Sequence, residues 1–500
     1  MARVIKIALA GVVCILAMGI VLASLAPQRA KPRNILMVVV DSLPAERLGC
    51  YGYSRVVNGV KTSMTPNIDS LVEKGTLFEN CISQSNWTPT SMASMLYSAN
   101  PTARSFSHSF DYLSTLGADH CLFSEMSKSF IEYDYDRYCV QTNPYLMGST
   151  FTSMFDFLAN VVPRPFRTSD YRLMGKDVIH GDAGAVNKQA YSVISGAKKK
   201  DRGFVLYLHY MDVHEPYPWH PAFCQALGIA GKGPENFGDL RNDCCVAYMK
   251  GGSTGQYAPD FAKRIERLSS DYDQSLAYLD NRLGELFKYL EDQRLMEDTF
   301  LIFCADHGQQ FGQHGNIGHC LDMHHEETHV PLVFVGGGMP AGVRVPTQVR
   351  NLDIIPTIEE FVGLHPKSDG EELLSVAKAA EALSPAPDRE VFSCSDYPSD
   401  INPDKMMKMI VSPSRLKYIA TEDKTGKVVK EELFDLLKDG DERTNLASAT
   451  PDEIAAMRAR LAEIYSQAPS RPAPSTASAP AKGPKSPVIR ERLRSVGYLH

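Results

Sequence analysis

The sequence predicts an α/β fold: a doubly wound, mostly parallel sheet followed by a small C-terminal α+β subdomain. Short apolar runs at 34–40, 204–208, 300–304 and 332–335 have the composition of strands that are buried on both faces. They alternate with helical stretches, and the longest of these, 265–289, has apolar residues three and four positions apart. Strands that alternate with helices are typical of parallel sheets.

Size and composition limit the class of protein. The 500 residues are enough for a large core and a smaller second domain. The net charge of -7, without a basic tract that carries aromatic residues, argues against a nucleic-acid partner. The 11 cysteines show no regular spacing, so the sequence indicates neither a zinc finger nor a particular disulfide pairing.

The chain divides into five expected segments. They are an N-terminal membrane anchor or signal segment with its linker, a catalytic domain, a connecting segment, a C-terminal subdomain, and a flexible tail rich in Pro, Ala and Ser that ends in a short helix. Their bounds are 1–32, 33–366, 367–387, 388–467 and 468–500. Within the subdomain we expect strands at 409–412 and 417–421 and a helix at 451–467.

The N-terminus has the pattern of a membrane segment. Arg3 and Lys6 precede an apolar run at 7–26, which is long enough to cross a bilayer as a helix. A cleaved signal peptide is the alternative, because 23–26 contains small residues, but Pro27 directly after it disfavours cleavage. Both alternatives export the rest of the chain. We therefore expect a membrane-anchored protein with its catalytic domain on the extracytoplasmic side, periplasmic or extracellular.

Two predicted strands end in side chains that can bind a metal. The first runs into Asp41, and the strand at 300–304 runs into Asp306 and His307, within CADHGQQFGQHG at 304–315. Ligands of open α/β sheets bind beyond the carboxyl ends of the strands. A single Asp at a strand end is more often a turn or cap residue. Two such ends, one with an adjacent His, predict one shared divalent cation.

The same stretches resemble the sulfatase family, which belongs to the alkaline phosphatase superfamily. The similarity runs in order from about residue 33 to residue 462. It includes NILMVVVDSLPAERLGCYGYSR, TPNIDSLVEKGTLFENCISQS, HYMDVHEPY, HEETHVPLVF, LDIIPTIEEFVGL and ELFDLLKDGDERTNLA. The resemblance implies the fold predicted above and an enzyme that hydrolyses or transfers sulfuric or phosphoric esters.

The resemblance also implies a nucleophile. Sulfatases carry it in a Cys/Ser-x-Pro-Ser-Arg segment at the start of a helix, and WTPTSMASML at 87–96 places Thr88 at that position. Thr88 cannot be oxidised to formylglycine, so we expect none, and Thr90 and Met92 replace the motif proline and arginine. If Pro89 is the motif proline instead, Trp87 takes the position and the protein is inactive.

Other readings of Thr88 also remain open. Thr-Pro is a common way to begin a helix, which would make Thr88 a cap, and a neighbouring Ser could act as nucleophile instead.

The implied metal set is that of a phosphoryl-transfer enzyme. Ser42 and His307 stand where many calcium sulfatases have Asp and Asn. A Thr nucleophile with an Asp-His pair resembles the phosphoethanolamine and glycerol-phosphate transferases of the superfamily. One divalent ion, Zn, Mn or Ca, is then expected, and the imidazole favours Zn or Mn. Its expected ligands are Asp41, Thr88, Asp306 and His307.

Further histidines are candidates for proton transfer. By resemblance, His214 in HEPY contacts the ester oxyanion or the leaving group, and His319 in NIGHC protonates the leaving group. His209 competes with His214 and is expected to be structural. His324 and His325 could furnish a second cation but are not part of the predicted set.

We therefore expect an exported, metal-dependent hydrolase or transferase that acts on a phosphate or sulfate ester through Thr88. Its substrate would be a small-molecule, glycan or lipid ester. The alternative is a non-catalytic sulfatase-like protein that binds anionic glycans or lipid head groups. The presence of Asp41, Asp306 and His307 together favours the enzyme. The sequence indicates neither the particular substrate nor the oligomeric state.

Overall fold

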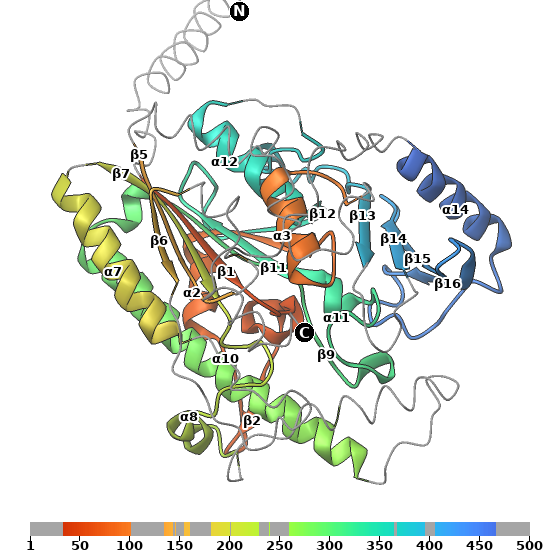
Figure 1. Cartoon of the computed structure of the whole chain (residues 1–500), viewed down its shortest axis with the longest axis horizontal. Helices are drawn as coiled ribbons and strands as arrows, with labels where there is room; N and C mark the ends of the chain where they lie inside the picture. The colour runs from red at the N-terminus through yellow and green to blue at the C-terminus, as the bar shows by residue number, and fades with distance from the viewer. Residues whose placement is uncertain are drawn as a thin grey trace, which may run out of the picture.

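A computed structural model describes residues 34–101, 135–143, 146, 155–160, 182–200, 202–229, 240, 260–364, 368–395 and 406–466. Within these residues the chain forms a large sheet covered by helices on both sides, with a smaller sheet beside it (Figure 1).

The large sheet has eight strands in the order β12-β4-β11-β8-β1-β7-β5-β6. Neighbouring strands are parallel except at β11, which is antiparallel to β4 and to β8. The predicted mostly parallel sheet is therefore confirmed. The strands are β1 (Asn34–Val40), β4 (Gly75–Ile82), β5 (Tyr135–Gln141), β6 (Phe157–Asn160), β7 (Gly203–Tyr210), β8 (Thr299–Ala305), β11 (His329–Val335) and β12 (Val343–Arg350).

Helices cover both faces of this sheet. α2, α7 and α10 pack together on one side, and α3 and α12 lie on the other (Figure 1). The predicted helix at 265–289 is the central part of α10, whose buried side chains, such as Leu268, Leu276 and Leu283, recur at helical spacing. The helices are α2 (Pro66–Lys74), α3 (Thr88–Tyr97), α7 (Ala183–Lys200), α10 (Phe261–Asp292) and α12 (Ile354–Val362).

A carboxylate of α10 caps the start of α2. Asp280 accepts hydrogen bonds from the backbone N–H groups of Asn67, at 3.1 Å, and of Ile68, at 2.8 Å. These first-turn groups have no partner within their own helix. Burial raises the pKa of Asp280 to about 6. Gly284 permits the close approach, because a Cβ there would lie 2.4 Å from the side-chain oxygen of Asn67.

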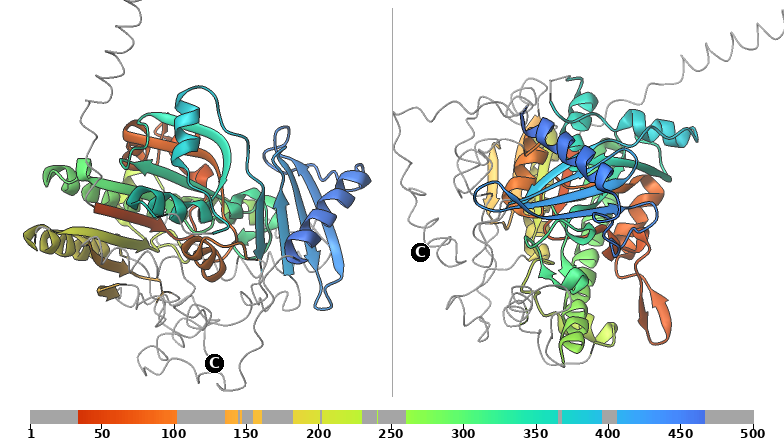
Figure 2. Two further views of the ribbon diagram at one scale, coloured as in Figure 1. Left: turned by 90° about the horizontal axis from the view of Figure 1, so that it is seen from above. Right: turned by 90° about the vertical axis from the view of Figure 1, so that its right-hand side faces the viewer.

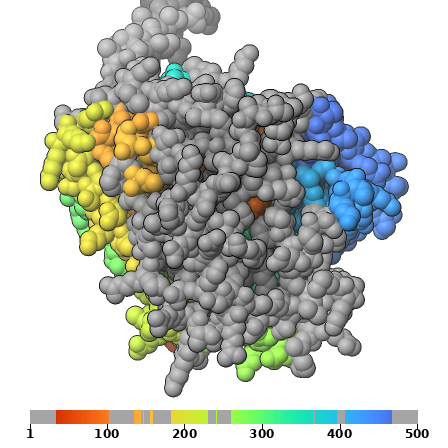
Figure 3. All heavy atoms as spheres, viewed as in Figure 1, coloured from red at the N-terminus to blue at the C-terminus, as the bar shows by residue number. Residues whose placement is uncertain are grey.

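The small sheet is antiparallel, in the order β13-β14-β15-β16, and α14 packs on it (Figure 2). Its strands are β13 (Val391–Ser395), β14 (Met406–Val411), β15 (Leu416–Glu422) and β16 (Val428–Asp435). The helix α14 (Pro451–Ser466) buries Ile454, Met457 and Leu461. On the face drawn in Figure 3, the subdomain, in blue, forms one edge of the described part and α7, in yellow, the other.

The expected connecting segment contains a helix, α13 (Leu374–Glu381). Its Val376 and Ala377 are buried in the core of the large domain, and the helix packs against β12. The expected N-terminal anchor and the C-terminal tail lie outside the described residues. Among the described residues, the structure shows no helix both long and apolar enough to cross a membrane.

Candidate active site

Strand pairing brings two carboxylates together. β1 and β8 are parallel neighbours with Val40 opposite Ala305. Asp41 and Asp306 are the next residues of their chains, so both leave the sheet at the same edge. Both side chains are fully buried. The sequence prediction that these two residues converge therefore agrees with the strand register.

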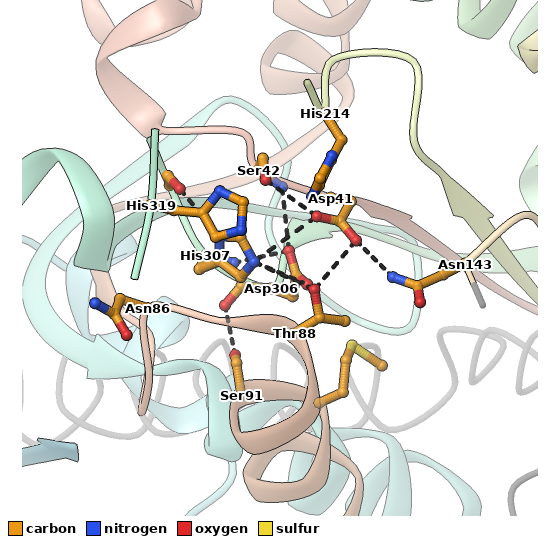
Figure 4. Close-up of polar contacts among 12 residues, drawn as sticks. Asp41, Ser42, Asn86, Thr88, Ser91, Asn143, His214, Asp306, His307 and His319 are labelled. Atoms are coloured by element: carbon orange, nitrogen blue, oxygen red, sulfur yellow. Dashed lines mark hydrogen bonds and ion pairs between the residues drawn. The ribbon is translucent and has the colours of Figure 1, made fainter. Parts of the chain in front are cut away.

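Thr88 is the first residue of α3, and its hydroxyl lies between the groups of the predicted metal set. It donates a hydrogen bond of 3.3 Å to Asp41 Oδ2, and it lies 3.3 Å from His307 Nε2 (Figure 4). The N-cap position of α3 belongs to Trp87, which has extended backbone angles. The Thr88 side chain therefore faces Asp41 and His307 instead of capping its helix.

Hydrogen bonds hold the first turn of α3 against Asp306, one of the predicted metal ligands. Ser91, one turn after Thr88, donates a hydrogen bond to the backbone carbonyl of Asp306. Asn351 in turn donates to the Ser91 hydroxyl at 3.0 Å. These buried bonds fix the start of α3 relative to the end of β8, which sets the position of the Thr88 hydroxyl.

Asp306 and His307 each present one atom that is free to bind a cation. Asp306 Oδ1 accepts from the backbone N–H groups of Ser42, at 3.3 Å, and His307, at 2.8 Å, whereas Asp306 Oδ2 is buried without a hydrogen-bond partner. His307 Nδ1 donates to the carbonyl of Gly308 at 3.0 Å, which leaves a lone pair on Nε2. That Nε2 lies 3.7 Å from Asp41 Oδ1 and 3.6 Å from Asp306 Oδ2.

These atoms fit a divalent cation. Two carboxylates and an imidazole with a fixed tautomer form a ligand set that suits Zn or Mn. The unpartnered oxygen of Asp306 would otherwise carry the cost of a buried polar group without a hydrogen bond. Burial, together with the charge of Asp41, raises the pKa of Asp306 to about 7, as expected for two neighbouring buried carboxylates.

Two further residues lie at the site: His209, which was expected to be structural, and Asn143, which the sequence did not indicate. His209, near the end of β7, lies with its Nε2 3.2 Å from Asp41 Oδ2, and its Nδ1 is 2.8 Å from the hydroxyl of Tyr207. Its ring nitrogen, with one oxygen each of Asp41 and Asp306, forms a group within 4.8 Å, so His209 borders the predicted metal site and orients Asp41 there. Asn143 donates a bond of 2.6 Å to Asp41 Oδ2.

The signals for these two residues differ. His209 pairs with Val39 in the β1–β7 ladder, so its place near a strand end could have indicated the site. Asn143 follows β5 in a region without a recognisable motif, and the sequence offered no signal for it.

Asp41 is surrounded by hydrogen-bond donors. Burial alone would raise its pKa, but the hydrogen bond from His209 and the nearby charges of His214 and His307 hold the pKa of Asp41 well below its ordinary value. Asp41 is therefore a carboxylate, and its negative charge is available to a cation.

His214 and His319 also lie at the site, and the carboxylate of Glu215 lies between them. Glu215 Oε2 is 3.5 Å from His319 Nδ1 and 3.7 Å from His214 Nδ1. The ring of His319 lies 4.6 Å from that of His307, measured between centroids. Burial lowers the pKa of His319 to about 4, whereas for His214 the charges of Glu215 and Asp41 outweigh burial and raise the pKa.

The two histidines considered for a second cation have different surroundings. His324 Nδ1 lies 3.0 Å from Asp322, and its ring stacks on that of His314. His325 lies beside His329 instead, with ring nitrogens 3.2 Å apart. The structure therefore does not place these two histidines in one ligand set.

With this geometry established, comparisons with known proteins decide the family. The sequence profile of the family described as Sulfatase matches residues 33–364. The chain belongs to the sulfatase family. Among curated proteins it is similar to Arylsulfatase K of Xenopus laevis, with 28% identity over 225 residues, which are 44% of this chain and 41% of that protein. The chain thus matches only about two fifths of the length of such relatives.

Solved structures share the fold. The protein BT4656, in complex with D-glucosamine-2-N,6-O-disulfate, superposes with a TM-score of 0.65 at 18% identity, over 87% of this chain and 97% of that one. The phosphonate monoester hydrolase of Agrobacterium radiobacter gives a TM-score of 0.61 at 17% identity, over 87% and 96%. At these identities the likeness establishes the alkaline phosphatase-like fold. Enzymes of the sulfatase family are metal-dependent ester hydrolases.

Replacing Asp306 with Asn should weaken Mn²⁺ binding by at least about tenfold, because a charged ligand becomes a neutral one. Calorimetric titration of metal-free protein measures the change. The matched control is Asp156→Asn, since Asp156 is an exposed carboxylate paired with Arg137. Equal Mn²⁺ affinity in the wild type and in Asp306→Asn would contradict this assignment of the site.

Proposed function

We propose that this protein is a metal-dependent hydrolase or transferase of phosphate esters, with Thr88 as its nucleophile. The observation that carries the proposal is the position of the Thr88 hydroxyl, 3.3 Å from both Asp41 Oδ2 and His307 Nε2 at the buried start of α3. A helix N-terminus favours an attacking oxyanion and the phosphate group that it receives.

The residues that would hold the cation are Asp41, Asp306 and His307, together with Thr88. We propose one divalent ion, Zn, Mn or Ca, which when bound lowers the pKa of the nucleophile and neutralises charge on the ester. The protein contributes the orientation: Gly308 fixes the tautomer of His307, and the α3 contacts fix Thr88.

The proposed reaction has two steps. The Thr88 oxygen forms a bond to phosphorus while the bond from phosphorus to the leaving oxygen breaks. His319 or His214 gives a proton to that oxygen. Water or an acceptor alcohol then attacks the phosphothreonine, and Thr88 Oγ1 departs and regains a proton.

The identity of residue 88 favours phosphorus over sulfur. A threonine cannot form the aldehyde hydrate from which sulfate is expelled by elimination, so a sulfated Thr88 would need direct attack by water. A phosphothreonine is open to in-line attack. The substrate class we propose is therefore a small-molecule, glycan or lipid phosphate ester, with sulfate esters as poorer substrates.

Thr88→Ala should lower kcat/KM on an aryl phosphodiester by about 10³-fold or more, because the covalent step is lost. Thr88→Ser is the matched control, since it keeps a hydroxyl at the same position and should retain a measurable part of the rate.

The wild type should prefer the aryl phosphodiester to the matching aryl sulfate. A clear preference for the sulfate, or full activity in Thr88→Ala, would refute the mechanism. If the metal-loaded wild type turns over none of these esters, the result favours the alternative, a non-catalytic protein that binds anionic glycans or head groups.

The histidine that protonates the leaving group can be identified by comparing how each variant releases a poor and a good leaving group. Replacing with Ala the histidine that acts as the acid, His319 or His214, should slow the release of an alkyl alcohol by roughly 10² to 10⁴-fold. The same change should slow the release of p-nitrophenol much less, because nitrophenolate leaves without a proton. Comparing His319→Ala with His214→Ala shows which ring acts as the acid. An equal loss with both leaving groups in both variants would mean that neither histidine donates the proton.

We also propose export, with residues 7–26 as a retained membrane anchor and the catalytic domain outside the cytoplasm. The support is the basic flank and apolar length of the N-terminal sequence. Full-length protein extracted from membranes should retain Met1 or Ala2 as its first residue in N-terminal sequencing. A mature chain that starts near Pro27 would mean a cleaved signal peptide.

A further inference from the structure

A second group of possible metal ligands lies where the segment after β1 meets the start of β11. Glu46 belongs to the short helix η1 (Ala45–Arg47), His325 to α11 (His325–Thr328), and His329 is the first residue of β11. The Nε2 atom of His325 lies 3.2 Å from Nδ1 of His329. Glu46 Oε2 lies 4.0 Å from the first of these nitrogens and 3.9 Å from the second.

These spacings suit three ligands of one small cation. Zn²⁺ binds imidazole nitrogen and carboxylate oxygen at roughly 2.0 to 2.2 Å in tetrahedral geometry, which separates ligand atoms by roughly 3.3 to 3.6 Å. The three distances observed lie within about half an ångström of that range. A small movement of the Glu46 side chain, which is 31% exposed, would complete the geometry.

The orientation of His329 also fits a ligand. Its Nε2 lies 2.8 Å from the backbone carbonyl of Glu79, an acceptor, so Nε2 carries the proton and Nδ1 has the lone pair. That lone pair faces His325 and Glu46. A ligand imidazole whose other nitrogen donates to a backbone carbonyl is a recurrent feature of metal sites.

The charge around Glu46 provides a second, independent observation. Glu46 Oε2 is buried and has no hydrogen-bond partner. Burial, together with the carboxylates of Glu326 and Glu442, raises its pKa. The nearby cations are engaged elsewhere: Arg47 with Asp273, and Lys417 with Glu442 at 2.7 Å. A bound cation would give Glu46 Oε2 a partner and favour the charged form of this carboxyl.

We propose that Glu46, His325 and His329 bind a second divalent cation of the Zn²⁺ class, with water as the fourth ligand. The ion links η1, whose Glu46 lies five residues after Asp41, to β11, the strand that lies beside β8. It is structural: it holds two segments that border the catalytic edge of the sheet. The side chains of Glu46 and His325, each 31% exposed, leave a route by which the ion enters.

The sequence HEETH at 325–329 matches the HExxH motif of zinc proteases, in which both histidines lie on one face of a helix. The structure here is different. α11 ends at Thr328, so the two histidines do not lie on one continuous helix. Glu326 faces His314, at 3.4 Å. The third ligand comes from Glu46 instead.

The test counts bound Zn²⁺ in full-length protein dialysed against a Zn²⁺ buffer, by elemental analysis. The wild type should bind two equivalents. A chain in which Asp41 and Asp306 are both Asn should keep one. Adding Glu46→Gln or His325→Ala to that chain should remove it, whereas His220→Ala, a histidine that stacks on Tyr278 elsewhere, should not. Co²⁺ substituted into the Asp41→Asn/Asp306→Asn chain should show the visible absorption of a tetrahedral site.

The outcomes separate this inference from the proposed function, on whose catalytic cation it does not depend. If the Asp41→Asn/Asp306→Asn chain binds no Zn²⁺ and the wild type binds one equivalent, the second site is refuted and the catalytic site stands. Retention of the second equivalent in both Glu46→Gln and His325→Ala also refutes the second site. As an independent check on folding, Zn²⁺ should raise the Tm of the Asp41→Asn/Asp306→Asn chain and leave that of its Glu46→Gln derivative unchanged.

Discussion

The pairing of β1 with β8 is the constraint on which the rest of the site depends. It places two carboxylates side by side in the protein interior, where like charges repel strongly unless other groups compensate them. The surrounding structure supplies part of that compensation. Asp41 Oδ2 receives hydrogen bonds from Thr88, His209 and Asn143, and Asp306 Oδ1 receives two from the backbone. Asp306 Oδ2 has no hydrogen-bond partner, and a bound cation would supply the missing interaction.

The position of Thr88 follows from contacts behind it. α3 is buried along its whole length, so its first residue cannot move without disturbing the core. Met92, which replaces the family arginine, is fully buried, and its sulfur lies 3.8 Å from the Tyr207 hydroxyl. Tyr207 in turn contacts His209.

The sequence predicted those parts of the protein whose signal is local. β1, β7 and β8 are apolar runs, and α10 has a clear helical period, so all four could be identified. The direction of β11 could not, because an apolar run has the same composition in either orientation. β4 was missed because it follows α2 without a turn and includes the polar pair Glu79-Asn80. Asn143 reaches the site only through the tertiary position of β5, which no nearby motif indicates.

The antiparallel direction of β11 determines the position of the side chains in residues 306–328, which connect β8 to β11. Because β11 is antiparallel to β8, with Leu332 opposite Cys304, it begins at the edge of the sheet where β8 ends. The intervening residues 306–328 therefore start and finish at one edge, and they bring His319 back beside His307. A connection anchored at both ends by adjacent strands tolerates changes in length at small entropic cost. A change in the length of this connection would thus leave the two carboxylates at the strand ends in register.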